Sequence, residues 1–187
     1  MKEKSDNELM DLICTRNEKA FSELYDRYAQ KLLRFMNRLL NYNEEKAKDM
    51  LQDVFVKIIQ QPELYNSSKA FSPWVYRVCA NICRNDLRNS QNRNRINKVI
   101  HSETDFIVNT SVINSVDLDL FRKHYKVLFE TLDEEQQLLL VLHFQEEMLL
   151  KDIAVVMGIP EGTVRSRLFY LLKKFSVLLK EFDPKQN

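Results

Sequence analysis

The stretch Gly158–Leu168 reads GIPEGTVRSRL and holds both glycines of a 187-residue chain, with one of its four prolines between them. Apolar residues before and after it recur at helical spacing. Two helices joined by a three- to four-residue turn that contains glycine are typical of a helix-turn-helix motif. We therefore expect a short helix over residues 151–157, a turn over 158–160 and a long helix over 161–182.

The composition as a whole favours an all-α fold. Tight turns in β-structure usually need Gly, Asn or Pro, whereas long helices need few of them, and this chain has two Gly and four Pro. Hydrophobic residues make up 44% of the chain, which is enough for buried cores, and the net charge is only +1. We expect two small helical domains joined by a flexible linker.

Apolar spacing divides the chain into segments. Residues 1–90 read as a domain of four helices, the first with a capping box at Ser5–Glu8 and the fourth restarting at Ser72-Pro73, with Ser72 as N-cap. Residues 91–117 are rich in Asn, Ser and Thr and read as the linker. Residues 118–187 read as a second domain of four helices that ends in the helix-turn-helix.

Several classes of protein and site are disfavoured. No apolar run approaches the ~18 residues of a membrane span, and the N-terminus lacks the apolar core of a signal peptide, so we expect a cytoplasmic protein without membrane insertion. Three cysteines argue against a disulfide framework. Cys79 and Cys83 are four residues apart but lack a nearby third ligand, so we interpret them as buried thiols and expect no metal or cofactor.

The fourth helix carries a basic stripe. Between Lys69 and Lys98 there are seven basic residues and one acid, Asp86. On a helical projection Val78 lies on the side that we expect to face the core, together with Trp74, Val75, Ile82 and Asn85. The other side, which suits phosphates and base edges, carries Arg77, Asn81, Arg84 and Arg88.

A polar loop over residues 61–72 precedes this helix. Its centre is flanked by aromatic residues, and aromatic side chains beside a basic stripe can stack on unpaired bases. A core role competes with this reading for the aromatic residues, and for Trp74 we favour the core. The candidate residues for holding a melted base are Asn66, Ser67, Ser68, Lys69, Phe71 and Trp74.

Two further helices have distinct polar faces. The third helix bears carboxylates and an amide, which suit a protein partner or plain solvent, at Asp49, Gln52 and Asp53. In a helix-turn-helix the second helix enters the major groove, where Arg can pair with guanine and Ser or Thr can adapt to several bases. The outward residues of the last helix that we expect to do so are Glu161, Gly162, Thr163, Arg165, Ser166, Arg167, Tyr170 and Lys173.

Taken together, these segments resemble bacterial RNA polymerase sigma factors of the extracytoplasmic-function group. The resemblance covers nearly the whole chain and rests on several motifs in order. In the first domain these are AFSELYDRY (20–28), AKDMLQDVFVKII (47–59) and FSPWVYRVCANICRNDLRN (71–89), and in the second LDEEQQLLLVLHF (132–144) and DIAVVMGIPEGTVRSRL (152–168).

The resemblance implies a polymerase specificity subunit with no catalytic site of its own. It implies that Asp49, Gln52 and Asp53 dock on the β′ clamp of core RNA polymerase, within a complex that includes the β subunit. It further implies that the loop and the fourth helix read and melt the −10 promoter element, that the last helix reads the −35 element, and that an anti-sigma factor or another recruiting protein is a partner.

One segment departs from the family pattern. Family members often carry Gly and then Ser before the short helix of the motif, whereas this chain has Glu147-Met148-Leu149-Leu150. We expect an exposed acidic and apolar surface over residues 146–150, which either meets a partner or weakens −35 reading. A helix-turn-helix regulator that binds operator DNA without polymerase is the alternative function, and a hydrolase using Asp49 and Asp53 has little support.

Overall fold

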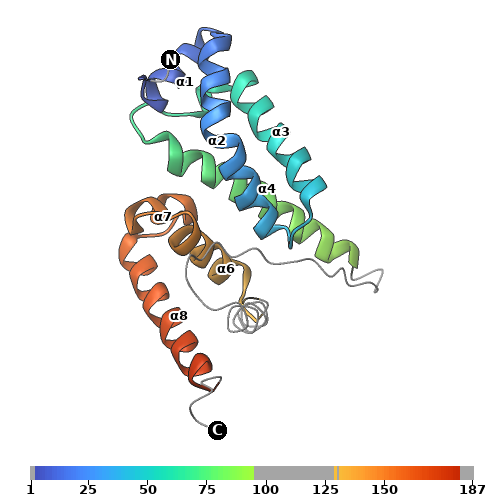
Figure 1. Cartoon of the computed structure of the whole chain (residues 1–187), viewed down its shortest axis with the longest axis vertical. Helices are drawn as coiled ribbons and strands as arrows, with labels where there is room; N and C mark the ends of the chain where they lie inside the picture. The colour runs from blue at the N-terminus through green and yellow to red at the C-terminus, as the bar shows by residue number, and fades with distance from the viewer. Residues whose placement is uncertain (1–2, 95–128, 130, 182–187) are drawn as a thin grey trace, which may run out of the picture.

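The computed structural model describes residues 3–94, 129 and 131–181, and helices dominate these ranges, with no strand among them. Figure 1 shows two groups of helices. The first contains α1 to α4, and the second contains α6, a short π-helix, α7 and α8. This agrees with the all-α prediction. The expected linker beyond residue 94 and the expected helix that begins near residue 118 lie outside the described residues, except for Phe129.

Local capping explains where the first three helices begin. Helix α1 spans Asp6–Cys14 and has the expected capping box, in which Ser5 and Glu8 bind each other's backbone N–H. Helix α2 spans Glu18–Leu39 and α3 spans Glu44–Gln60. Each begins after an asparagine, Asn17 or Asn43, whose side chain accepts a hydrogen bond from the backbone three residues on.

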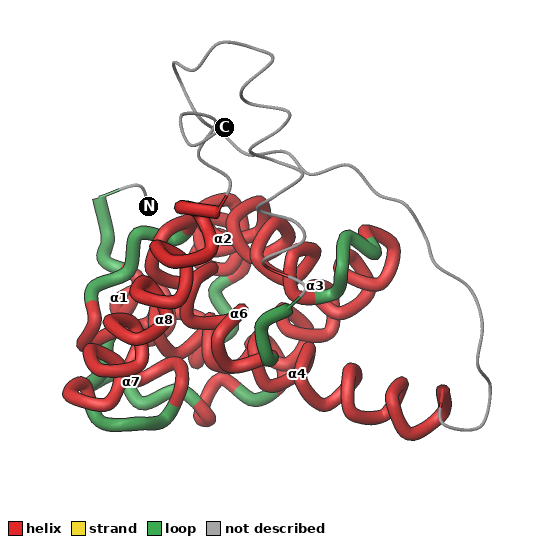
Figure 2. The backbone as a smooth tube through the Cα atoms, turned by 90° about the horizontal axis from the view of Figure 1, so that it is seen from below, coloured by secondary structure: helices red, strands yellow, loops and turns green. Residues whose placement is uncertain are grey.

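Helix α4, which spans Phe71–Asn94, follows a 3₁₀ turn at Pro62–Leu64 and differs from prediction at both ends. It starts at Phe71 rather than after Ser72, and it continues past residue 91, where we expected the linker. Figure 2 shows its C-terminal end running beyond the other described helices.

The buried face of α4 is also rotated from the predicted one. Asn85 is exposed, and Val78, Trp74 and Ile82 are only half-buried. Val75, Cys79 and Cys83 are buried as predicted, and the other buried apolar side chains of α4 are Phe71, Tyr76 and Ala80. The buried face differs from the predicted one because the second helical group also packs on α4 and covers a further part of its surface.

The second group comprises α6 (Glu134–Leu140), the π-helix (Val141–Gln145), α7 (Leu150–Met157) and α8 (Glu161–Glu181). Asp133 caps α6, and its side chain accepts a hydrogen bond from the backbone N–H of Gln136. The core of this second group contains Leu139, Leu142, Ile153 and Val164, all at most 1% exposed. Burial of such side chains is the main force that holds short helices in place.

The two groups contact each other mainly through α4 and α7. Figure 1 shows α7 beside α4, with α8 leading away from the first group. A Cβ atom placed on Gly158, in the turn between α7 and α8, would lie 3.5 Å from the guanidinium of Arg77. None of the described helices combines the length and the apolar character needed to cross a membrane.

Candidate nucleic-acid and protein interfaces

The polar loop before α4 presents a continuous exposed edge. Every residue from Asn66 to Ala70 is exposed. The loop has a defined shape, because the Asn66 side chain accepts a hydrogen bond from the backbone N–H of Ser68 at 2.9 Å, and the N–H of Lys69 binds the Asn66 carbonyl at 3.0 Å. Four of the predicted −10 residues are therefore available to solvent on one short turn.

Phe71 does not belong with them. Its side chain is 1% exposed, so the prediction that it contacts DNA directly is wrong for this structure. It packs instead among Tyr28, Tyr65 and Trp74, with ring centroids 5.0, 5.6 and 5.6 Å away respectively. Trp74 is half-buried and packs against the core. These rings form an aromatic base on which the polar loop rests.

Three residues of the predicted stripe on α4 face solvent and one does not. Arg77, Asn81 and Arg88 are exposed, whereas Arg84 is half-buried. Arg84 lines a small cavity between α4 and α6, and Gln137 of α6 lines the same cavity. Because Arg77 also lies against Gly158, the second helical group covers part of the stripe.

Helix α3 presents the predicted ridge of Asp49, Gln52 and Asp53, all exposed. Beside it, between α2 and α3, lies an apolar groove of about 460 Å³ that sequence reasoning missed. Large apolar side chains remain exposed here, Tyr25 at 44% and Ile59 at 51%. The sequence does indicate such a surface, because α3 carries apolar residues, Val56 and Ile59, outside its buried positions. The groove is lined by Phe21, Tyr25, Leu33, Gln52, Phe55, Val56 and Ile59, among others.

The helix-turn-helix has the expected geometry. Gly158 ends α7 with φ 69° and ψ 32°, a left-handed conformation that glycine adopts without a Cβ clash, and its N–H binds the Ala154 carbonyl at 2.9 Å. Beyond the turn, Val164 and Leu168 are buried. The predicted readers lie on the other side of α8: Thr163 is half-buried, and Glu161, Gly162, Arg165, Ser166, Arg167, Tyr170 and Lys173 are exposed.

Both arginines on this side of α8 form ion pairs with carboxylates. Arg165 binds Glu161 at 2.9 Å, one helical turn away, and Arg167 binds Glu135 of α6. Both pairs are exposed, and exposed ion pairs contribute little stability. Exchanging these carboxylates for a base edge or a phosphate therefore costs little.

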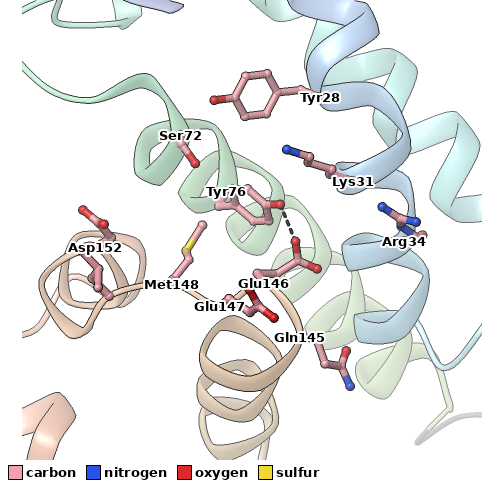
Figure 3. Close-up of a pocket in the computed structure, with 11 residues that line it drawn as sticks. Tyr28, Lys31, Arg34, Ser72, Tyr76, Gln145, Glu146, Glu147, Met148 and Asp152 are labelled. Carbon is pink, nitrogen blue, oxygen red and sulfur yellow. Dashed lines mark hydrogen bonds between the residues drawn. The ribbon is translucent and has the colours of Figure 1, made fainter. Parts of the chain in front are cut away.

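The segment before α7 overturns one prediction. Leu149 is 60% exposed, as expected, but the Glu146 side chain is only 10% exposed. Tyr76 of α4 donates a hydrogen bond to Glu146 Oε2 at 2.5 Å, and Arg38 of α2 lies 3.4 Å from Oε1. Figure 3 shows Glu146 pointing from the second group toward Tyr76. The partner of Glu146 is thus the chain's own first helical group.

Burial raises the pKa of Glu146, and the Tyr76 hydrogen bond and the nearby cations Arg38, Arg34 and Lys31 oppose that rise. A cavity of about 400 Å³ lies beside this contact, with Lys31 and Arg34 on one wall and Glu147 and Asp152 on the other.

Glu147 occupies an unusual backbone conformation, with φ 51°. The departure from the family pattern therefore carries backbone strain, because a glycine would adopt that conformation freely. Leu149 caps α7 without a side-chain hydrogen bond, which agrees with the missing N-cap hydroxyl.

The cysteines Cys79 and Cys83 are buried, which raises the pKa of both thiols, that of Cys83 to about 12. Within the described ranges, no group of three or more His, Cys, Asp or Glu side chains is arranged to hold a metal ion.

Comparison with known families matches both helical groups. Residues 24–93 match the Sigma-70 region 2 model, and residues 128–175 match the Sigma-70 region 4 model. The chain is 28% identical over 173 residues to the ECF RNA polymerase sigma-E factor of Haemophilus influenzae, a match that covers 88% of this chain and 90% of that protein. It is 25% identical to the RNA polymerase sigma-H factor of Pseudomonas aeruginosa, covering 89% and 90% respectively.

Solved structures share the fold across most of the chain. CnrH in complex with the cytosolic domain of CnrY has a TM-score of 0.69 and 21% identity, covering 95% of this chain and 99% of that one. The sigma factor RpoE in complex with the anti-sigma factor NepR from Bartonella quintana has a TM-score of 0.68 and 18% identity, covering 87% and 98%. With regions 2 and 4 present in order, the chain belongs to the RNA polymerase sigma factors of the extracytoplasmic-function group.

Proposed function

We propose that this chain is an alternative sigma factor, which binds core RNA polymerase in the cytoplasm and directs initiation at promoters with matching −35 and −10 elements. It supplies recognition and no catalytic chemistry of its own. The observation that carries the proposal is the presence of two separate surfaces suited to DNA, one on each helical group, together with an apolar groove suited to a protein. A regulator that only binds an operator needs a surface suited to DNA but does not need the groove.

The groove between α2 and α3 is the proposed polymerase-docking surface. Its exposed apolar side chains supply the buried centre of an interface, and the carboxylates Asp49 and Asp53 supply a polar rim. The groove thus extends the predicted site of three polar residues to a mixed surface. A basic, partly apolar element of the polymerase, such as a helix of the β′ clamp, fits this chemistry.

The two DNA surfaces have different tasks. The loop Asn66–Lys69, with Arg77, Asn81 and Arg88, suits an unpaired −10 strand, because its polar groups are exposed and cations lie beside it. The start of α8 suits the major groove of a duplex −35 element.

In the present arrangement the second helical group partly covers the DNA surface of α4, since Gly158 lies against Arg77 and Arg84 lines a cavity with α6. We propose that the two helical groups separate when the holoenzyme forms. The similar RpoE structure named above is in complex with the anti-sigma factor NepR, and we propose that an anti-sigma factor likewise binds this protein and holds it in a compact form.

The proposal is tested in two steps. The protein is mixed with core RNA polymerase and passed over a sizing column, and the complex is then used for run-off transcription on a genomic library with start sites read by sequencing. Co-elution and starts that depend on this chain are expected. Absence of both, with binding of duplex DNA by the free protein, would establish the operator-binding regulator instead.

A further inference from the structure

A side chain of α1 holds the polar loop from beneath. The Asn7 amide nitrogen donates two hydrogen bonds to loop carbonyls, to Ser67 O at 2.9 Å and to Lys69 O at 3.0 Å. These partners lie 60 and 62 positions away in the sequence, so the contact is a feature of the tertiary fold. An asparagine amide has two N–H donors, and both are used here on the same short turn.

Tyr65 completes the arrangement from the other side. Its side chain is buried, and its hydroxyl lies 2.6 Å from Asn7 Oδ1 and 2.5 Å from Lys69 O. One hydroxyl proton is shared between these two acceptors, so both polar atoms of the Asn7 amide group, Oδ1 and Nδ2, lie within the network. Burial raises the pKa of the Tyr65 hydroxyl, so it remains a donor across the physiological range.

The consequence is that two loop carbonyls are directed inward while the side chains of the loop stay exposed. The backbone N–H of Ser68 is satisfied by the Asn66 side chain. A loop held in this way does not have to be ordered when it binds, and a pre-ordered binding loop has a higher affinity and a sharper selectivity than a flexible one.

We propose that Asn7 and Tyr65 are positioning residues that fix the loop in the shape that receives an unpaired base of the −10 element. This rests on the proposed function of the chain as a sigma factor. Neither residue needs to touch DNA, because both act through the carbonyl groups of Ser67 and Lys69. They should therefore determine base selectivity at the −10 element without affecting the −35 contact or polymerase docking.

The sharpest variant is Asn7→Asp, which keeps the shape of the side chain but removes both N–H donors and places a carboxylate against two carbonyl oxygens. Tyr65→Phe removes only the hydroxyl. Gln60→Glu, an exposed residue at the end of α3, makes the same amide-to-carboxylate change outside the network and serves as the control. Each variant is assembled with core polymerase.

The measurement is the affinity of each holoenzyme for a fluorescent single-stranded −10 oligonucleotide from a dependent promoter, and for oligonucleotides with each base substituted in turn. Asn7→Asp should lower affinity for the matched strand about tenfold and flatten the preference among bases. Affinity for core polymerase and for duplex −35 DNA should change less than twofold. The double variant Asn7→Asp/Tyr65→Phe should bind the matched strand no more weakly than Asn7→Asp alone, since the two substitutions disrupt the same network.

Retention of the full base preference by Asn7→Asp would overturn the inference, and so would an equal loss in Gln60→Glu. If Asn7→Asp unfolds, as judged by circular dichroism, Tyr65→Phe alone must flatten the base preference, and failure to do so would also overturn it. A wild-type holoenzyme with no base preference would instead count against the proposed function.

Discussion

The contact at Glu146 gives a quantitative prediction about the separation of the two helical groups. Changing Glu146 to Ala removes the 2.5 Å hydrogen bond from Tyr76 and the 3.4 Å ion pair with Arg38. It also leaves the Tyr76 hydroxyl without that partner in a buried position. A hydrogen bond to a charged group contributes about 1.5–3 kcal/mol. With about 2 kcal/mol lost, the equilibrium between contacting and separated groups should shift about 30-fold toward separation.

The chain offers a direct way to measure this shift. Cys14 is exposed on the first group, whereas Cys79 and Cys83 are buried, so spin labels can be placed on Cys14 and on a cysteine introduced at the exposed Ser176 of α8. Pulsed electron resonance then reports the distance distribution. The wild-type chain should give one narrow distance, and Glu146→Ala should add a broad population at longer distances.

Two variants separate the stated cause from simple damage. Glu146→Gln keeps an acceptor for Tyr76 and carries no charge to bury, so the groups should stay in contact. Glu147→Ala changes the exposed neighbour and keeps its Cβ, so it should leave the narrow distance unchanged. The reasoning fails if Glu146→Ala retains the wild-type distribution, or if Glu146→Gln separates the groups as fully as Glu146→Ala does.

The pH dependence follows from the raised pKa of Glu146. A carboxyl whose pKa is higher in the contact than in the separated chain favours contact while it is protonated. That contribution is complete below the ordinary pKa of glutamate and is lost as the pH rises through the raised value. Acidification should therefore sharpen the wild-type distance distribution, and the effect should be absent in Glu146→Gln.

Three further predictions concern the turn, the segment before α7 and the groove. Gly158→Val forces a β-branched residue to φ 69°, which costs at least about 1–2 kcal/mol, so duplex −35 binding should fall in a gel-shift assay while the variant still co-elutes with polymerase. Glu147→Gly relieves a φ of 51° and should raise the free energy of unfolding by about 0.5–1 kcal/mol in urea titrations; a decrease would show that the Glu147 side chain has a stabilising role. Val56→Asp or Ile59→Asp should abolish co-elution with core polymerase, whereas Leu64→Asp, exposed outside the groove, should not.

Features that depend on residues close together in the chain are predicted well from the sequence. The predicted capping box at Ser5–Glu8 begins α1, because both of its residues lie within the turn that they cap. Gly158 begins the turn that was predicted over residues 158–160, and it ends α7 in a left-handed conformation. Capping and turn residues act within a few positions of themselves, so their effect is visible in the sequence alone.

The misses come from contacts between distant segments. Glu146 was expected on the surface because its neighbours are acidic and apolar, but Tyr76 and Arg38 lie 70 and 108 positions away. Phe71 was a candidate for DNA contact because aromatic residues beside a basic stripe can stack on bases, but the competing core role holds, since it is buried against α2 residue Tyr28. The groove was missed because apolar residues at helical spacing do not say whether a neighbouring helix covers them.

The second helical group covers part of the DNA surface of α4 but leaves the groove between α2 and α3 open. No described residue of the second helical group lines the groove between α2 and α3, whereas that group does reach the α4 stripe at Arg77 and Arg84. Docking to polymerase through the groove therefore does not require the groups to separate first. Contacts with polymerase that form after the two helical groups separate then slow dissociation of the chain from polymerase.

This order makes a kinetic prediction. Because the groove is open in both arrangements, Glu146→Ala should leave the association rate with core polymerase within about twofold of wild type. Its dissociation should slow, by at most the ~30-fold shift in the equilibrium, because less free energy is spent on separating the groups. Surface-immobilised polymerase gives both rates by interferometry. An association rate that rises in proportion to the separated population would mean that the groups must part before docking, and that the contact at Glu146 controls access to the groove itself.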